Sequence, residues 1–370
     1  MALLVTGGIL LVYAVALLVP AMAFFFAKKE KATTEKSFIT ILVPARNEEA
    51  SLKDCLESLS RQRYPATHFE VIVIDDHSTD KTLQLARGFV NDRTNFRVLT
   101  NEDGSQGKKA ALSAGIQQAK GTIIATTDAD CVIPATWLET IAAAFANENI
   151  QLVCGPVKYK RSRKFLRHFL QIEQLSMQLL AGGAAKLGFP MLCSGANLAY
   201  RKTFFLRHGG YANDPYVSGD DMLLLEKAKK ENPRSIVFLT EPAAIVETNA
   251  AASLAEALRQ RARWLSKSGA YGGSAAGMYG LIVLLANALV PLGFVFSLCC
   301  NDGFFLFGAA LFGKAAVDLL LLSLAVLFFR EPLLLLLVLP GELIYPLLAV
   351  ASSLKAFSGT IFWKDRLWKK

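Results

Sequence analysis

The hydrophobic residues of this chain gather in two regions near its ends, with a long region of mixed polarity between them. Residues 3–26 are almost wholly apolar, and residues 275–354 are apolar with brief polar breaks. About 20 apolar residues in a row are enough to span a bilayer. The pattern therefore predicts an N-terminal transmembrane helix over residues 1–27 and about three C-terminal ones, near residues 278–300, 304–329 and 332–353.

Three charged residues lie within the C-terminal apolar segments, away from the polar breaks between them: Lys314, Asp318 and Glu342. Charged side chains inside a membrane segment usually face a partner or a water-filled cavity. Two interpretations therefore stay open, namely pairing between helices, which we favour, and a path for a substrate.

Basic residues and cysteines indicate the side of the membrane on which the middle region lies. A mainly basic cluster, residues 28–31, follows the first apolar segment, and no basic residue precedes that segment. This order favours an anchor with a cytoplasmic domain after it over a cleaved signal peptide. The six cysteines show no paired metal-ligand spacing, as expected of reduced thiols in the cytosol. We predict a multi-pass protein of the cytoplasmic membrane whose soluble domain is cytosolic.

The two segments that flank the C-terminal apolar region are basic and contain tryptophan. Residues 249–272 are predicted to form an amphipathic helix at the membrane interface, and residues 355–370 a basic interfacial tail. Three C-terminal crossings would place that tail outside the cell, whereas its composition favours the inside. The topology of the tail therefore stays open.

The middle region, residues 38–248, alternates between short apolar runs and helical patterns. This alternation predicts an α/β domain with a mostly parallel sheet. Polar residues follow several of the predicted strands, and in such sheets ligands bind at the carboxyl ends of strands. A nucleotide site is therefore expected there. The predicted strands cover residues 39–44, 69–74, 96–99 and 121–127, and the polar residues after them include Asn47, Asp75, Asp76, Asp128 and Asp130.

Several common nucleotide and hydrolase motifs are missing from the sequence. No Gly-x-Gly-x-x-Gly follows the first strand, and neither a P-loop nor a Gly-x-Ser-x-Gly elbow occurs. The formal charge of +9 comes without a basic, aromatic-interleaved element of the kind that binds nucleic acid. The charge is better explained by the anionic leaflet of the membrane and by phosphate. We therefore predict no nucleic-acid partner.

Asp128 and Asp130, two residues apart at the end of an apolar strand, are the first candidate for chemistry. Two carboxylates there favour a hard divalent cation that also binds phosphate; an Asx turn that closes the strand is the alternative. Three further clusters have equally ordinary alternatives: a tight turn at residues 194–197, helix capping by Asp220 and Asp221, and membrane anchoring by residues 258–264.

Together these clusters resemble a known family. Seven motifs occur in order: residues 44–48 (PARNE), 75–80 (DDHSTD), 107–110 (GKKA), 128–130 (DAD), 194–197 (SGAN), 219–221 (GDD) and 260–264 (QRARW). The chain is similar over about residues 38–268 to the membrane-integrated family 2 glycosyltransferases with the GT-A fold. That group includes cellulose, hyaluronan and poly-N-acetylglucosamine synthases and ceramide-type glucosyltransferases.

The resemblance implies a role for each motif. Pro44, Ala45, Arg46, Asn47 and Glu48, with Asp75 and Asp76, would hold the uracil and ribose of a UDP-sugar, and Lys108 would lie along the nucleotide. Asp128 and Asp130 would coordinate Mg²⁺ or Mn²⁺, Asp130 more directly. Ser194, Gly195, Asn197, Gln260, Arg263 and Trp264 would contact the diphosphate or the acceptor. The general base would be Asp221 or Asp220; the family usually has Glu-Asp here, and we favour the second residue, Asp221.

The chemistry that follows is a transfer with inversion. One base and no second nucleophilic carboxylate indicate direct displacement, which turns an α-linked donor into a β-linked product. We favour a membrane-associated hydroxyl acceptor, either a lipid or a lipid-linked glycan, which makes membrane lipids partners as well. A processive polysaccharide synthase and, more remotely, a non-catalytic nucleotide-sugar-binding subunit of an envelope complex are the alternatives. The sequence does not predict the sugar, the metal or the oligomeric state.

Overall fold

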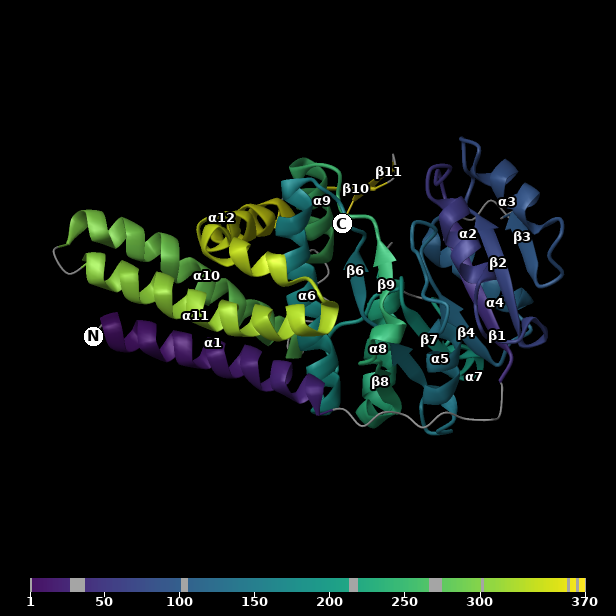
Figure 1. Cartoon of the computed structure of the whole chain (residues 1–370), viewed down its shortest axis with the longest axis horizontal. Helices are drawn as coiled ribbons and strands as arrows, with labels where there is room; N and C mark the ends of the chain where they lie inside the picture. Colours follow the sequence, from purple (N-terminus) through teal and green to yellow (C-terminus); the bar gives the residue numbers. More distant parts are fainter. Residues whose placement is uncertain are drawn as a thin grey trace. The chain divides into compact units, whose positions relative to one another are not determined.

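The computed structural model describes residues 2–26, 37–100, 106–212, 219–265, 275–300, 303–357, 360–363 and 366–369. The chain divides into two compact units. We name them after what the sequence leads us to expect: the membrane unit contains residues 1–26, 161–183 and 250–370, and the catalytic unit contains residues 27–160 and 184–249. Figure 1 labels their helices and strands.

The catalytic unit is built on a seven-stranded sheet of order β3-β2-β1-β4-β7-β5-β8. The four strands from β3 to β4 are parallel, whereas β7 is antiparallel to both of its neighbours. This confirms the predicted α/β fold with a mostly parallel sheet. The strands are β1 (Ile39–Ala45), β2 (Phe69–Asp75), β3 (Phe96–Thr100), β4 (Ile123–Thr126), β5 (Leu152–Cys154), β7 (Leu198–Arg201) and β8 (Ile236–Phe238).

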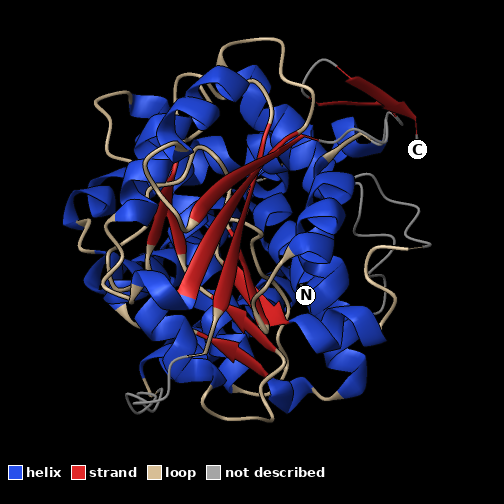
Figure 2. Ribbon diagram, turned by 90° about the vertical axis from the view of Figure 1, so that its right-hand side faces the viewer, coloured by secondary structure: helices blue, strands red, loops and turns tan. Residues whose placement is uncertain are grey.

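Helices cover this sheet, and the strands are buried because they carry apolar side chains on both faces (Figure 2). Gly115 in α4 lets that helix approach closely, since a Cβ there would lie 2.9 Å from Leu42 and 3.1 Å from Ile74. The central strands therefore keep a fixed register, and their carboxyl ends share one edge. The helices are α2 (Leu52–Ser60), α3 (Thr82–Val90), α4 (Lys108–Gln118), α5 (Trp137–Phe145), α7 (Lys202–Arg207) and α8 (Asp220–Glu231).

A second, two-stranded parallel sheet belongs to the same unit. It pairs β6 (Val157–Tyr159) with β9 (Val246–Thr248), and Tyr159 lies opposite Thr248. In chain order, both strands end just before the chain passes into the membrane unit.

The membrane unit is helical apart from a terminal hairpin. In the described part of the chain, four helices are long and apolar enough to cross a membrane. Three of them, α1, α10 and α11, pack against one another (Figure 1). The elements are α1 (Ala2–Phe25), α6 (Phe165–Lys186), α9 (Leu254–Leu265), α10 (Ala275–Cys299), α11 (Gly303–Phe329), the 3-10 helix η4 (Pro332–Leu337), α12 (Val338–Phe357), β10 (Thr360–Trp363) and β11 (Arg366–Lys369).

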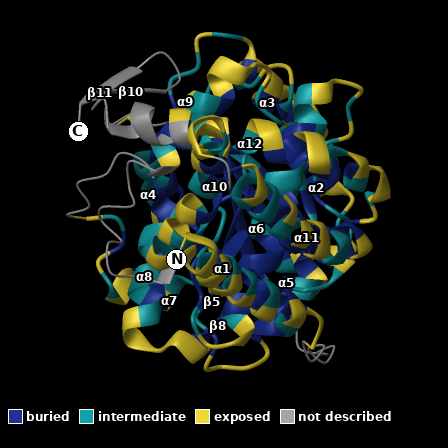
Figure 3. Cartoon of the chain, turned by 90° about the vertical axis from the view of Figure 1, so that its left-hand side faces the viewer, coloured by how far each residue is buried: buried dark blue, intermediate teal, exposed yellow. Residues whose placement is uncertain are grey.

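Large apolar side chains remain exposed along these helices (Figure 3), as expected of surfaces that face lipid. They include Leu4, Leu11, Leu292, Phe312, Leu327 and Leu347. Of the two predicted interfacial segments, residues 266–274 and residues 358–359, 364–365 and 370 lie outside the described residues. The described remainder forms α9, the end of α12 and the β10–β11 hairpin.

Helix α6 interrupts the domain that was predicted to be continuous over residues 38–248. Most of it belongs to the membrane unit. Gly183 explains part of this, because its missing side chain lets α6 meet the backbone of Pro20 in α1. The sequence had indicated no separate role for these residues.

Lys314, Asp318 and Glu342 pair within the membrane unit. The Lys314 ammonium lies 2.6 Å from Asp318 Oδ2 and 2.7 Å from Glu342 Oε2. The Tyr13 hydroxyl of α1 donates a hydrogen bond to Asp318 Oδ1 at 2.6 Å. The favoured interpretation, pairing between helices, is confirmed, and the contacts join α1, α11 and α12.

Candidate active site

Two neighbouring loops, after β1 and after β2, are fastened to each other. The Asn47 side-chain oxygen accepts a hydrogen bond from the Thr79 N–H at 2.8 Å, and the Asn47 N–H donates to Ser78 Oγ at 3.1 Å. Arg46 donates to the Asp76 carbonyl oxygen at 2.9 Å. Asn47 and His77 have φ values of 52° and 58°, a strained region for non-glycine residues that is often found at functional sites. Pro44 and Ala45 end β1, and Glu48 follows in the same loop.

Asp75 ends β2 and Asp76 follows it, and their carboxylates bind different groups. Both oxygens of Asp76 accept the Gly107 N–H, at 3.0 and 3.1 Å, so that Asp76 fixes the start of α4. Asp75 Oδ2 accepts the Ser78 N–H at 3.2 Å, whereas Oδ1 is buried and has no hydrogen-bond partner among the described residues. Buried polar atoms are nearly always satisfied. Asp75 Oδ1 is therefore a place where a bound nucleoside could donate a hydrogen bond.

Lys108, the first residue of α4, lies between two aspartates from distant parts of the chain. Its ammonium nitrogen is 2.7 Å from Asp128 Oδ1 and 3.6 Å from Asp220 Oδ2. Burial lowers the pKa of Lys108, but the charges of Asp128 and Asp220 outweigh it and hold that pKa well above its usual range. The lysine therefore stays charged. It brings the loop after β4 and the start of α8 to one place.

Asp130 lies in the same loop as Asp128. Burial and the charge on Asp128 raise the pKa of Asp130, although hydrogen bonds from Thr248 and Asn249 act in the opposite direction. Two carboxylates that repel each other in a partly buried site favour a bound cation. In the described part of the chain, no group of three or more acidic, histidine or cysteine side chains could hold a metal. The pair nevertheless fits Mg²⁺ or Mn²⁺, since such ions commonly take one or two carboxylates and complete their shell with phosphate and water.

Asp221, the second residue of α8, faces the loop that contains Gly195. Its Oδ2 accepts the Gly195 N–H at 3.0 Å, and Oδ1 accepts the Met222 N–H at 2.8 Å. A Cβ at position 195 would lie 3.0 Å from Lys108 Nζ and 3.1 Å from Asp220 Oδ2. Gly195 is therefore the point at which the backbone passes close to the lysine and both aspartates.

Asn197 has a different place from its neighbour Gly195. Its side chain is 1% exposed and spans three contacts: Oδ1 accepts from Trp137 Nε1 at 2.8 Å, and Nδ2 donates to the carbonyls of Pro156 and Ala244 at 2.9 and 2.8 Å. These bonds make Asn197 a support for the loop. Ser194 accepts the Ala196 N–H at 3.4 Å within the same turn.

Gln260, Arg263 and Trp264 lie on α9, in the membrane unit, and their predicted contacts with the diphosphate and acceptor stay predictions. Their neighbour Arg261 is buried and forms an ion pair with Glu173 of α6. The Tyr345 hydroxyl of α12 donates to the same carboxylate at 2.7 Å. Arg261 thus fastens the motif-bearing helix inside its unit, a role that the sequence had not indicated.

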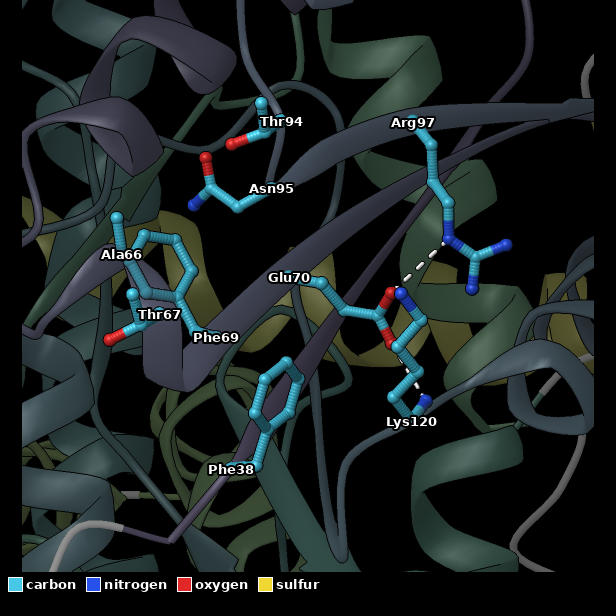
Figure 4. Close-up of a pocket in the computed structure, with 9 residues that line it drawn as sticks. All are labelled: Phe38, Ala66, Thr67, Phe69, Glu70, Thr94, Asn95, Arg97 and Lys120. Atoms are coloured by element: carbon cyan, nitrogen blue, oxygen red, sulfur yellow. Dashed lines mark hydrogen bonds and ion pairs between the residues drawn. The ribbon is translucent and has the colours of Figure 1, made fainter.

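A pocket of about 230 Å³ lies at the opposite ends of the strands, where β2 and β3 begin (Figure 4). Glu70 crosses it and accepts hydrogen bonds from the Lys120 N–H at 2.7 Å and Arg97 Nε at 3.2 Å. None of the predicted site residues lines this pocket. The candidate active site is therefore the cluster around Lys108.

The fold of the catalytic unit is the GT-A fold of glycosyltransferases. A mannosyltransferase from Pyrobaculum calidifontis, solved with GDP-mannose and Mn²⁺, has the same fold. It matches this chain with a TM-score of 0.60 and 19% identity, over 95% of this chain and 99% of that one. Residues 40–209 match the sequence profile of glycosyl transferase family 2, and this domain belongs to that family.

Curated relatives agree over shorter stretches. The chain is 35% identical to the glycosyltransferase AglE of Haloferax volcanii over 127 residues, which are 34% of this chain and 41% of AglE. It is 33% identical to a β-monoglucosyldiacylglycerol synthase of Nostoc over 117 residues, 31% of this chain and 25% of that one. The chain thus spans less than half the length of either relative.

Proposed function

We propose that this protein transfers a sugar from a UDP-sugar, with inversion, to the hydroxyl group of a membrane-associated acceptor, with Mg²⁺ or Mn²⁺ as cofactor. The observation that supports this best is the convergence of Lys108, Asp128, Asp220 and Asp221 beside Gly195. The cluster combines a charged lysine that suits a diphosphate with carboxylates that suit a cation and a proton transfer.

The nucleoside would bind between the loops after β1 and β2. Asp75 Oδ1 is free to accept a hydrogen bond from it, and the bonds between Asn47 and residues 78–79 hold the two loops together. Loops that are already fixed lose little entropy when the donor binds. Asp76 acts indirectly, by holding Gly107 so that Lys108 points at the diphosphate.

The base would take the proton of the acceptor hydroxyl as it attacks the sugar. Asp221 is our choice, because Asp220 is engaged by the charge of Lys108, at 3.6 Å. The Gly195 N–H orients the Asp221 carboxylate. A divalent cation held by Asp128 and Asp130 would neutralise the charge that grows on the leaving diphosphate.

The acceptor would come from the membrane. Four helices that are long and apolar enough to cross a bilayer support this assignment, and so does the Nostoc relative, which is named for a glycolipid product. Gln260, Arg263 and Trp264 would contact the diphosphate or the acceptor, as the resemblance to membrane glycosyltransferases implies.

The test is to incubate the full chain, in lipid, with Mn²⁺ and a panel of labelled UDP- and GDP-sugars. We expect transfer from a UDP-sugar to a product that partitions as a small glycolipid; a ladder of high mass would identify a polymer instead. Asp221→Asn should lower kcat by about 10²–10⁴-fold while UDP still binds.

Glu226→Gln, a change further along the same helix, where the carboxylate pairs with Lys229 at 2.7 Å, serves as the matched control and should leave kcat unchanged. Normal turnover by Asp221→Asn would refute the assignment of the base. The absence of both transfer and donor hydrolysis with every sugar nucleotide would refute the proposed activity.

A further inference from the structure

Strand β9 is held on both sides within the catalytic unit. On one side it pairs with β6, and the Lys160 N–H donates to the Thr248 carbonyl oxygen at 2.8 Å. On the other side Glu247 and Val132 exchange two backbone hydrogen bonds, of 2.7 and 3.0 Å. Val132 is two residues after Asp130. The end of β9 is therefore fixed in position next to the loop that carries the aspartate pair.

The residues at this end of β9 bind Asp130 directly. The Thr248 hydroxyl donates a hydrogen bond to Asp130 Oδ2 at 3.0 Å, and the Asn249 N–H approaches the same oxygen at 3.4 Å. Both donors act on one oxygen, so that they set the orientation of the whole carboxylate. Thr248 lies 118 residues further along the chain than Asp130.

We infer that Thr248 is a positioning residue for the cation site: its hydroxyl holds Asp130 in the orientation in which the carboxylate binds a divalent cation. This inference rests on the proposed function, in which Asp128 and Asp130 bind the metal. A hydrogen bond to a metal-binding carboxylate restricts its rotation and favours its ionised form. Loss of such a partner commonly weakens metal binding by about 10–100-fold.

The test measures binding of Mn²⁺ itself rather than turnover. The full chain in detergent, with UDP present, is titrated with Mn²⁺, and the free ion is followed by electron paramagnetic resonance. Thr248→Val keeps the size of the side chain but removes the hydroxyl, and it should raise the Kd for Mn²⁺ by about 10–100-fold. Thr248→Ser restores the hydroxyl and should bind Mn²⁺ within about threefold of the wild type.

Glu247→Gln is the matched control for damage to β9. It removes the ion pair between Glu247 and Lys158, which are 3.1 Å apart, without touching Asp130. Its Kd for Mn²⁺ should stay at the wild-type value. A wild-type Kd in Thr248→Val, or an equal loss in Glu247→Gln, would overturn the positioning role alone. Failure of the wild-type chain to bind Mn²⁺ would overturn the metal role in the proposed function as well.

Discussion

Two lysines in this chain each lie between two carboxylates, and the two clusters have opposite surroundings. Lys108 contacts Asp128 and Asp220 in the catalytic unit, at 2.7 and 3.6 Å. Lys314 contacts Asp318 and Glu342 in the membrane unit, at 2.6 and 2.7 Å. The charges are the same, one positive and two negative. The difference lies in access to water.

Two side chains of the Lys108 cluster remain accessible, since Lys108 is 20% exposed and Asp128 is 40% exposed, whereas Asp220 is 8% exposed. Asp128 follows the end of β4, where a ligand can enter and take over its contact with the ammonium group. In the other cluster Lys314 is 1% exposed and Glu342 is 5% exposed, and only Asp318, at 22%, reaches the surface. The ammonium group itself is therefore closed off by the helices around it. The same trio of charges therefore suits ligand binding in one place and helix pairing in the other.

The largest expected effect follows from removing the buried lysine. Lys314→Met leaves two carboxylates without their cation among apolar helices, which costs about 3–5 kcal/mol when one partner of a buried pair is lost. We expect a strong fall in the Tm of the full chain in detergent, or no folded protein at all.

A second variant keeps this prediction testable if Lys314→Met does not fold. Combining it with Asp318→Asn and Glu342→Gln removes every charge of the cluster and should recover most of the lost Tm. A wild-type Tm for Lys314→Met alone would contradict the role of the cluster in pairing the helices.

The equivalent change in the catalytic unit should affect binding rather than folding. Lys108→Met removes the cation that faces the diphosphate, and a hydrogen bond to a charged group contributes about 1.5–3 kcal/mol. The Kd for the UDP-sugar, measured by isothermal titration calorimetry, should rise by roughly 10- to 100-fold. The Tm should fall by less than in Lys314→Met, since Asp128 stays hydrated and only Asp220 is buried.

The control for this change is Lys120→Met, which removes one positive charge at the opposite ends of the strands. Its Kd should equal that of the wild type. If Lys108→Met instead lowered the Tm as strongly as Lys314→Met, the contrast between the two clusters would not hold.

The sequence predicted what depends on local pattern. The apolar runs at residues 39–44 and 69–74 became β1 and β2, and the aspartates after the strands came together at one edge of the sheet. Contacts between distant segments could not be predicted in this way. Thr248 meets Asp130 because β9 pairs with β6 on one side and with Val132 on the other, and no spacing in the sequence joins residue 248 to residue 130.

Helix α6 and Asn197 show the same limit. The sequence of α6 does not say which unit the helix packs in, and Gly183 gives no signal until Pro20 is placed beside it. Asn197 belongs to a motif that resembles a ligand site, yet its amide supports the loop through Trp137 and two carbonyl groups. A motif identifies a site, whereas the partners of each side chain depend on tertiary structure.

A smaller effect is expected when one carboxylate of the buried cluster is neutralised. Glu342→Gln leaves Lys314 paired with Asp318 alone, one charge against one, and the amide oxygen can still accept a hydrogen bond. Removing the excess negative charge offsets the loss of the ionic contact, so that stability should change by no more than about 1 kcal/mol. The Tm of the full chain in detergent measures this. A fall as large as that of Lys314→Met would mean that both carboxylates are needed as ions.

The smallest effect concerns Asp80, a carboxylate that belongs to neither of the two lysine clusters. Burial raises the pKa of Asp80, but the hydrogen bonds from Thr82 and the Glu49 N–H together outweigh it and hold that pKa below its usual range. A lowered pKa stabilises the folded state above the unfolded pKa, about 3.9, and this contribution is lost as the pH falls through the folded value. The Tm of the wild type should therefore fall as the pH is lowered from 5 to 3.

Asp80→Asn keeps an acceptor for the Thr82 N–H but cannot titrate, so it isolates this contribution. At pH 7 it should be less stable than the wild type by at most about 1 kcal/mol, and the difference should shrink toward pH 3. A difference that stays constant with pH would show that the charge of Asp80 contributes nothing, and that the hydrogen bonds alone hold the loop after β2. The charge of an accessible carboxylate would then contribute nothing to stability, whereas the charges of the Lys314 cluster hold helices together.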